Sequence, residues 1–172
     1  MILFDDVITL RAIEEEDAPV LQSMINDPEI ENAVVGFSYP VSLAQQKKWI
    51  AGLSDDKNIR YAIDDGNSLV GVAIISSVDF KNRVANLNIK LLKRARGQGY
   101  AKRAVRLMLS YCFNELNLNC ITANVLANNE ASSKLWQSFG FNLDGVLRQR
   151  VYKNGHYVDL MAYSLLRDEY DK

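Results

Sequence analysis

The sequence predicts a mixed α/β fold in a single domain, with about seven strands in a mixed central sheet flanked by about four helices. The chain has 172 residues, 48% of them hydrophobic and 24% charged, which is ordinary for one well-buried soluble domain. Its apolar residues alternate with the period of a strand in some segments and of a helix in others. Hairpin signals lie toward both ends, and residues 84–126 read as one strand–helix–strand unit. We therefore assign residues 1–172 to one domain.

The first elements follow from alternation and from helix signals. Residues 7–12 alternate as a strand does, and an acidic turn before about residue 16 favours a helix start there. Asn26-Asp27-Pro28 ends this helix, and residues 34–40 read as a loop. Ser42 and Gln45 have capping-box spacing and start a second helix that reaches about residue 53.

Three strands follow in the middle of the chain. Residues 59–63 and 69–78 flank Asp65-Gly66-Asn67, which is a hairpin signal. Residues 84–92 form the third strand, with Ala85 and Leu87 on one face. We therefore expect antiparallel pairing before the strand–helix–strand unit begins.

The second half contains two helices and three strands. Residues 101–116 show a broad apolar helical face, and residues 120–126 read as a buried strand. A helix over 131–139 starts after Asn128-Asn129 and ends at Gly140. Residues 141–152 and 157–166 pair around Asn154-Gly155, a strong hairpin marker.

A single positive stripe lies on an otherwise acidic protein of formal net charge −1. Between Phe80 and Asn114 there are nine of the chain's 20 basic residues and none of its 21 acidic ones. Near its centre is Arg94-Ala95-Arg96-Gly97-Gln98-Gly99-Tyr100-Ala101, which leads directly into a helix. Glycines let backbone amides face a ligand, and a helix start adds free N–H groups, so this segment predicts a phosphate site.

Several classes of function are excluded by absent signals. The P-loop pattern is missing, and Lys102 stands where a dinucleotide fingerprint needs its third glycine. No run approaches about 18 apolar residues, and residues 1–6 lack a basic region followed by an apolar run. We therefore expect no membrane span or secretory signal, and a cytoplasmic protein. Cys112 and Cys120 fit buried free thiols. The stripe has few aromatic residues, so we expect no nucleic-acid partner, and we expect no metal.

The glycine segment and a second motif together resemble the GNAT superfamily of acyl-CoA-dependent N-acetyltransferases. Arg94-x-x-Gly97-x-Gly99 is followed about 30 residues later by Asn129-x-Ala131-Ser132-x-x-Leu135-Trp136-x-x-Phe139-Gly140-Phe141. The resemblance covers nearly the whole chain. It implies a GNAT-like domain whose sheet contains a splayed pair of strands, and acetyl-CoA as co-substrate.

The resemblance also implies which residues hold the cofactor. Main-chain amides of the glycine turn would hold the pyrophosphate, and the strand over residues 88–92 would pair with the pantetheine arm. The implied cofactor-binding residues are Ile89, Leu91, Arg94, Arg96, Gly97, Gln98, Gly99, Tyr100, Ala101 and Asn129. Asn129 also fits a plain helix cap. Lys102, Arg103 and Lys134 are candidates for the adenosine 3′-phosphate.

The proton-transfer residues depart from the family pattern. Trp136 stands where many relatives have a Tyr that protonates the leaving thiolate, and indole is not an acid in this pH range. Asn86 stands where spermidine-acetylating relatives have Glu. Tyr152, Tyr157 and His156 of the final hairpin are alternative proton carriers. The catalytic candidates are therefore Tyr152, Trp136 and Asn86, with a water chain as another possibility.

The acceptor is predicted only as a class. Residues 1–79 hold fourteen acidic and five basic residues, and an acidic wall formed by Glu29, Glu31, Asp55 and Asp56 would favour a cationic amine. The resemblance extends to ribosomal-protein N-terminal, spermidine and amino-sugar acetyltransferases. We therefore expect a small-molecule or peptide amine as acceptor. A weakly catalytic acyl-CoA sensor is the alternative, and an exposed final hairpin leaves a homo-oligomer open.

Overall fold

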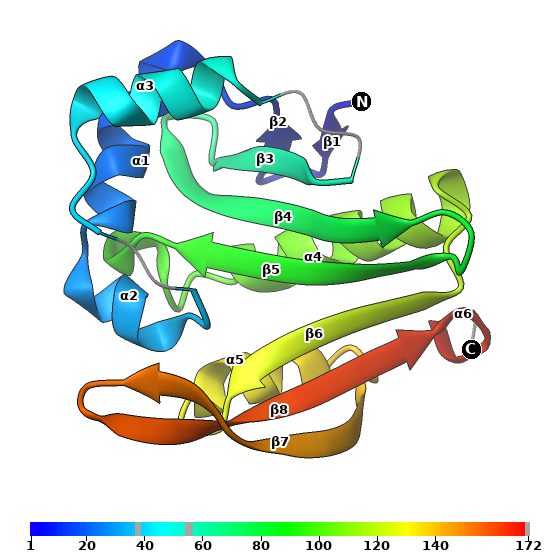
Figure 1. Cartoon of the computed structure of the whole chain (residues 1–172). Coiled ribbons are helices and arrows are strands. Elements are labelled where there is room, and N and C mark those ends of the chain that lie inside the picture. The colour runs from blue at the N-terminus through cyan, green and yellow to red at the C-terminus, as the bar shows by residue number, and fades with distance from the viewer. Residues whose placement is uncertain (37–38, 54–56, 171–172) are drawn as a thin grey trace.

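The computed structural model describes residues 1–36, 39–53 and 57–170. Over these residues the chain forms one sheet in the order β1-β2-β3-β4-β5-β6-β8-β7 (Figure 1). Its strands are β1 (Leu3–Phe4), β2 (Thr9–Arg11), β3 (Ile59–Asp64), β4 (Leu69–Asp79), β5 (Val84–Leu91), β6 (Cys120–Leu126), β7 (Asn142–Lys153) and β8 (His156–Leu166). Neighbouring strands are antiparallel except β5 and β6, which are parallel.

Helices cover both faces of the sheet. The α-helices are α1 (Ala18–Ile25), α2 (Pro28–Ala33), α3 (Leu43–Ala51), α4 (Tyr100–Ser110), α5 (Glu130–Gln137) and α6 (Arg167–Tyr170). Short 3₁₀ turns occupy Glu15–Asp17 and Lys93–Ala95, and a π-helical turn at Tyr111–Glu115 extends α4. The mixed α/β fold predicted from periodicity is confirmed, with eight strands over the described residues where about seven were expected.

Two apolar clusters fix these layers. The larger packs Val105, Met108 and Leu109 of α4 against strand residues such as Ile75 and Leu87. The smaller packs α1 and α2 against the opposite face, through contacts that include Leu21 and Ile30 with Val72. Alternate residues of β4 therefore face different helices, as the two-residue period of a strand requires.

Most elements begin and end close to their predicted positions, and the differences have local causes. Pro28 follows the end of α1 as expected, but it also occupies the first turn of α2, a helix that was not predicted. The Asp27 carboxylate accepts a hydrogen bond from the Glu29 amide at 2.8 Å and caps this short helix. The two-residue strand β1 pairs Leu3 with Leu10, and its length gives no recognisable alternation.

The sheet opens between β5 and β6. Their parallel pairing joins Val84, Ala85 and Asn86 to Cys120, Ile121 and Thr122, and goes no further. Beyond these pairs the two strands diverge, as Figure 1 shows. The later part of β5 therefore keeps its pairing with β4 on one side and has a free edge on the other.

Candidate active site

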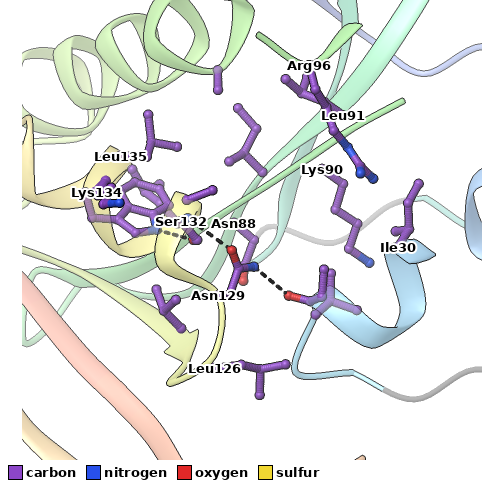
Figure 2. Close-up of a pocket in the computed structure, with 18 of the residues that line it drawn as sticks. Ile30, Asn88, Lys90, Leu91, Arg96, Leu126, Asn129, Ser132, Lys134 and Leu135 are labelled. Atoms are coloured by element: carbon purple, nitrogen blue, oxygen red, sulfur yellow. Dashed lines mark hydrogen bonds between the residues drawn. The ribbon is translucent and has the colours of Figure 1, made fainter. Parts of the chain in front are cut away.

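A cavity of about 870 Å³ lies where β5 and β6 separate. Its wall comes from both strands, from the end of α2 and the residues after it, from the glycine turn, and from α4 and α5 (Figure 2). Residues of both sheet faces take part, since Leu87 belongs to the α4 side and Ile30 to the α2 side. The cavity thus lies within the opening of the sheet, between the layers on its two faces.

Most of the residues implied as cofactor ligands lie at this cavity. Its lining includes Ile89, Leu91, Arg96, Gly97, Gly99, Tyr100, Ala101 and Asn129. Arg94 and Gln98 are not part of the lining. The Arg94 guanidinium donates to Ser68 Oγ and to the Leu69 carbonyl, both at 3.0 Å, and so ties the turn to the β3–β4 hairpin. Gln98 donates to the Arg94 carbonyl.

The glycine turn has the backbone that an anion site needs. Gly97 and Gly99 have φ angles of 77° and 83°, in the left-handed region that favours glycine. Gly99 is the N-cap of α4, and no side chain caps that helix. The first-turn N–H groups of α4 are thus available to a ligand, at the positive end of the helix dipole. A Cβ at either glycine would meet open space.

The cavity wall is positively charged. Four cationic residues line it, and among the described residues no Asp or Glu does; the cations are Lys90, Arg96, Lys102 and Lys134. Arg96 also forms an ion pair with Glu29, which lies outside the lining. Because a partly enclosed wall of one sign raises the local concentration of oppositely charged ligands, this surface suits phosphate.

Asn129 is a helix cap and a bridge. Its Oδ1 accepts from the Ser132 amide at 3.1 Å, which caps α5. Its Nδ2 donates to the Ala33 carbonyl at 3.0 Å, so the start of α5 is joined to the end of α2 across the cavity (Figure 2). Each polar atom of the amide has a protein partner, and the helix-cap interpretation of Asn129 is therefore confirmed.

Trp136 forms part of the inner wall. Its side chain is buried, and its ring packs on Phe141 with centroids 5.1 Å apart. The indole Nε1–H donates to Ser132 Oγ at 3.2 Å. This geometry assigns Trp136 a packing role and gives its only donor a protein partner.

The other two catalytic candidates lie outside the cavity lining. Asn86 is the last residue of β5 that pairs with β6. Its Nδ2 donates to Thr122 Oγ1 at 3.0 Å, and its Oδ1 accepts from Asn88. Tyr152 is 60% exposed on the final hairpin and packs against Tyr157. The structure does not bring Tyr152, Trp136 and Asn86 together.

The predicted acidic wall is neutralised where the structure describes it. Glu29 pairs with Lys93 at 3.0 Å and with Arg96, and their hydrogen bonds hold the pKa of its carboxyl below the usual value. Glu31 pairs with Lys153 at 2.7 Å. Asp55 and Asp56 lie outside the described residues. The two described acidic residues are therefore committed to protein cations and offer little attraction to a cationic amine.

Two lysines of the site region were not recognised from the sequence. Lys90 lines the cavity, and burial lowers the pKa of its ammonium. Lys153 is 7% exposed, although lysine is rarely buried without a partner. The alternation of β5 places Lys90 on the face opposite Leu87, and this was the available signal.

The cysteines contribute no nucleophile. Both are free, and burial raises the pKa of the Cys112 thiol to about 12, far from its reactive form at neutral pH. Burial also raises the pKa of the partly exposed Cys120. Within the described ranges, His, Cys, Asp and Glu form no group suited to a metal ion, and no helix is long and apolar enough to span a bilayer.

A sheet opened between two parallel strands, with a glycine turn starting a helix beside the opening, agrees with the acyl-CoA-dependent transferases that the sequence motifs resemble. The family model described as acetyltransferase (GNAT) domain matches residues 8–142. The chain therefore belongs to the GNAT acetyltransferase family.

Named relatives agree with this assignment. The chain is 31% identical over 172 residues to the uncharacterized N-acetyltransferase YoaA of Bacillus subtilis (strain 168), covering 96% of this chain and 97% of that protein. It is 29% identical to the putative ribosomal N-acetyltransferase YdaF of the same strain, covering 95% and 93%. A crystal structure of spermidine N-acetyltransferase from Vibrio cholerae, in complex with CoA and spermine, superposes with a TM-score of 0.90 at 24% identity, covering 98% and 100%.

Proposed function

We propose that this protein transfers the acetyl group of acetyl-CoA to a primary amine by direct attack in a ternary complex. The observation that supports this most directly is the cavity at the strand opening, with an uncapped helix start at one end and a free strand edge along its side. A thioester with a phosphorylated tail matches both features.

The cofactor would lie along β5. Its pyrophosphate would accept from the amides between Arg96 and Ala101, and Lys102 or Lys134 would approach the adenosine 3′-phosphate. The amides of the pantetheine arm would pair with the free edge of β5 near Ile89 and Leu91, as an added strand does. The acetyl group would then lie near the point where β5 and β6 separate.

The reaction requires no protein nucleophile. The acceptor nitrogen attacks the thioester carbonyl, a backbone N–H of β5 stabilises the oxyanion, and the CoA thiolate leaves. Asn86, Asn88, Ser76 and Thr122 form a hydrogen-bonded group beside this point, and we propose that it orders water for proton removal. Tyr152 is exposed and lies outside the cavity lining, so this proposal gives it no part in the step within one subunit.

The acceptor class rests on the relatives as well as on the cavity. Relatives named for spermidine and for ribosomal substrates both modify amines, so we propose a small-molecule or peptide amine. The alternative function, a weakly catalytic acyl-CoA sensor, is favoured by the absence of an acidic or basic side chain at Trp136 and Asn86.

One titration separates the two functions. Acetyl-CoA is added in a calorimeter, and thiol release is then followed with pooled polyamines, amino sugars, amino acids and peptides. Binding followed by release supports the transferase. Binding without release from any acceptor supports the sensor, and absent binding contradicts both.

We also propose that the protein acts in the cytoplasm and that the final hairpin pairs between copies. Cys112 and Cys120 are free thiols, which suits a reducing compartment. β7 is an edge strand, paired only with β8 among the described strands, and it exposes Leu143, Val146 and Leu147. Light scattering at several protein concentrations tests the association.

A further inference from the structure

Lys90 is a cation of the cavity wall to which the proposed cofactor site gives no role. It lies on β5 and projects toward Ile30 and α2, away from Lys134 and Leu135 of α5 (Figure 2). Val72, its partner on β4, and Asn88, two residues earlier on β5, lie on the same face of the sheet as Lys90. The proposed cofactor path follows the glycine turn and α5, so Lys90 stands on the side from which an acceptor would arrive.

The Lys90 side chain is half-buried, and within the described part of the chain its ammonium has no hydrogen-bond or ion-pair partner. The Glu31 carboxylate and the Lys153 ammonium both act on it electrostatically, with opposite signs, but Glu31 bonds to Lys153 at 2.7 Å. The Lys153 ammonium also donates to the backbone carbonyls of Glu31 and Gly36, at 2.8 and 2.6 Å. These three side chains leave one positive charge uncompensated at the cavity wall.

An enclosed cation without a counter-charge is costly, and the cost is removed when a ligand supplies the charge. Burial lowers the pKa of the Lys90 ammonium, in keeping with this cost. The remaining charged residues of the described lining are also cations, so the wall attracts anions. A carboxylate would form a charge-assisted hydrogen bond with Lys90 and satisfy it.

We propose that Lys90 binds a carboxylate on the acceptor, which makes the preferred substrate an amino acid or another small amine with a carboxylate beside its amino group. This inference rests on the proposed N-acetyltransferase function. It opposes the expectation of a cationic acceptor, because the described acidic residues Glu29 and Glu31 are paired while Lys90 is not. A polyamine would bring further positive charge against Lys90.

The test compares amine acceptors with and without a carboxylate. Thiol release from acetyl-CoA is measured with a panel of L-amino acids, with the corresponding amino acid amides, and with spermidine. The same set is run on Lys90→Gln, Lys90→Arg and the control Lys81→Gln, which removes an exposed lysine outside the cavity lining. Each variant's acetyl-CoA affinity is measured by calorimetry.

The expected result is a preference for the free amino acids that depends on Lys90. Lys90→Gln should lower kcat/KM for them by about 30-fold or more, the usual scale for truncating one partner of an enclosed charge pair. Its kcat/KM for the amides and its acetyl-CoA affinity should change little. Lys90→Arg should recover most of the loss, and Lys81→Gln should match the wild type.

Other results would overturn the proposal. Equal use of amides, or better use of spermidine, would refute the carboxylate preference while leaving the transferase intact. Loss of kcat toward every acceptor in both Lys90 variants would make Lys90 a proton carrier instead. The same assay is repeated with succinyl-CoA in place of acetyl-CoA, and a preference for succinyl-CoA that Lys90→Gln abolishes would assign Lys90 to the acyl group. No release with any amine would refute the transferase itself.

Discussion

Lys153 Nζ lies 2.7 Å from Glu31 Oε1, and this contact joins the end of β7 to α2 over a separation of 122 residues. Both side chains are largely buried, with exposures of 8% and 22%. The same ammonium donates to two carbonyls, so all three of its protons have partners. The pair therefore fixes the position of α2 and of Gly36 at the cavity wall.

Replacing Lys153 by Met should lower the free energy of unfolding by about 3–5 kcal/mol, because Glu31 and two carbonyls are left without their partner. Urea denaturation measures the loss. Lys134→Met is the matched control, since Lys134 pairs with Glu130 on the exposed face of α5 and should lose at most about 0.5 kcal/mol. Equal losses in the two variants would show that the buried pair has no special weight.

If the glycine turn binds phosphate, substitutions at its glycines should weaken acetyl-CoA binding by more than their loss of folding stability explains. Gly97→Leu and Gly99→Leu place a side chain at a φ of 77° or 83°, which should cost about 1–2 kcal/mol of stability each. They also place it in the space open to the ligand, so acetyl-CoA affinity should fall about tenfold or more.

Gly66→Leu is the control for this backbone strain. Gly66 has a φ of 87° and open space at its Cβ position, but it belongs to the β3–β4 hairpin outside the cavity lining. It should lose similar stability and keep its affinity in calorimetric titration. Unchanged affinity in the Gly97 and Gly99 variants would remove the phosphate site from the glycine turn.

Local signals predicted the elements, and tertiary contacts decided the site. Residues 120–126 were predicted as a strand and form β6 with the same bounds, because a short apolar run between polar turns is a local pattern. The Ser42–Gln45 capping box is present for the same reason. The buried state of Lys153 has no local signal, since it depends on Glu31 far away in the sequence.

The same distinction separates the site residues. The glycine turn was recognisable because a left-handed backbone conformation favours glycine, and glycines are visible in the sequence. The bond from Asn129 to Ala33 joins residues 96 apart in the sequence, so no spacing rule gave it. Trp136 and Ser132 stand four apart in α5, and this helical spacing was the available signal for their bond. Lys90 was identifiable as lying on one strand face, but its lack of a partner follows only from the pairing of Glu31 with Lys153.

Acid should weaken the fold partly through Asp17. Burial alone would raise the pKa of this carboxyl, but hydrogen bonds from Arg11 and from the Glu14 amide outweigh it and hold the pKa below the usual 3.8. A depressed folded-state pKa contributes stability that is present above the unfolded value and is lost as pH falls through the folded value. The contribution of Asp17 should therefore be complete at pH 6 and decline below about pH 4.

Thermal unfolding of wild type and Asp17→Asn between pH 2 and pH 6 measures this contribution. The difference in Tm between the two proteins should be largest near pH 6 and should shrink toward pH 2. Asp168→Asn is a suitable control because Asp168 lies on the exposed C-terminal helix α6. A difference that stays constant across this range would show that Asp17 acts through hydrogen-bond geometry alone.

Trp136→Phe should change kcat by less than about threefold, because the indole N–H is not an acid near neutral pH and already donates to Ser132. The loss of ring volume beside Phe141 should lower the free energy of unfolding by about 1–2 kcal/mol. Urea denaturation and the pH dependence of kcat measure the two effects separately.

Ser132→Ala is the matched variant, since it removes the acceptor of the same hydrogen bond and keeps the indole. A hundredfold loss of kcat in Trp136→Phe, with acetyl-CoA affinity intact and Ser132→Ala unaffected, would instead place the indole N–H in the chemistry of thiolate departure.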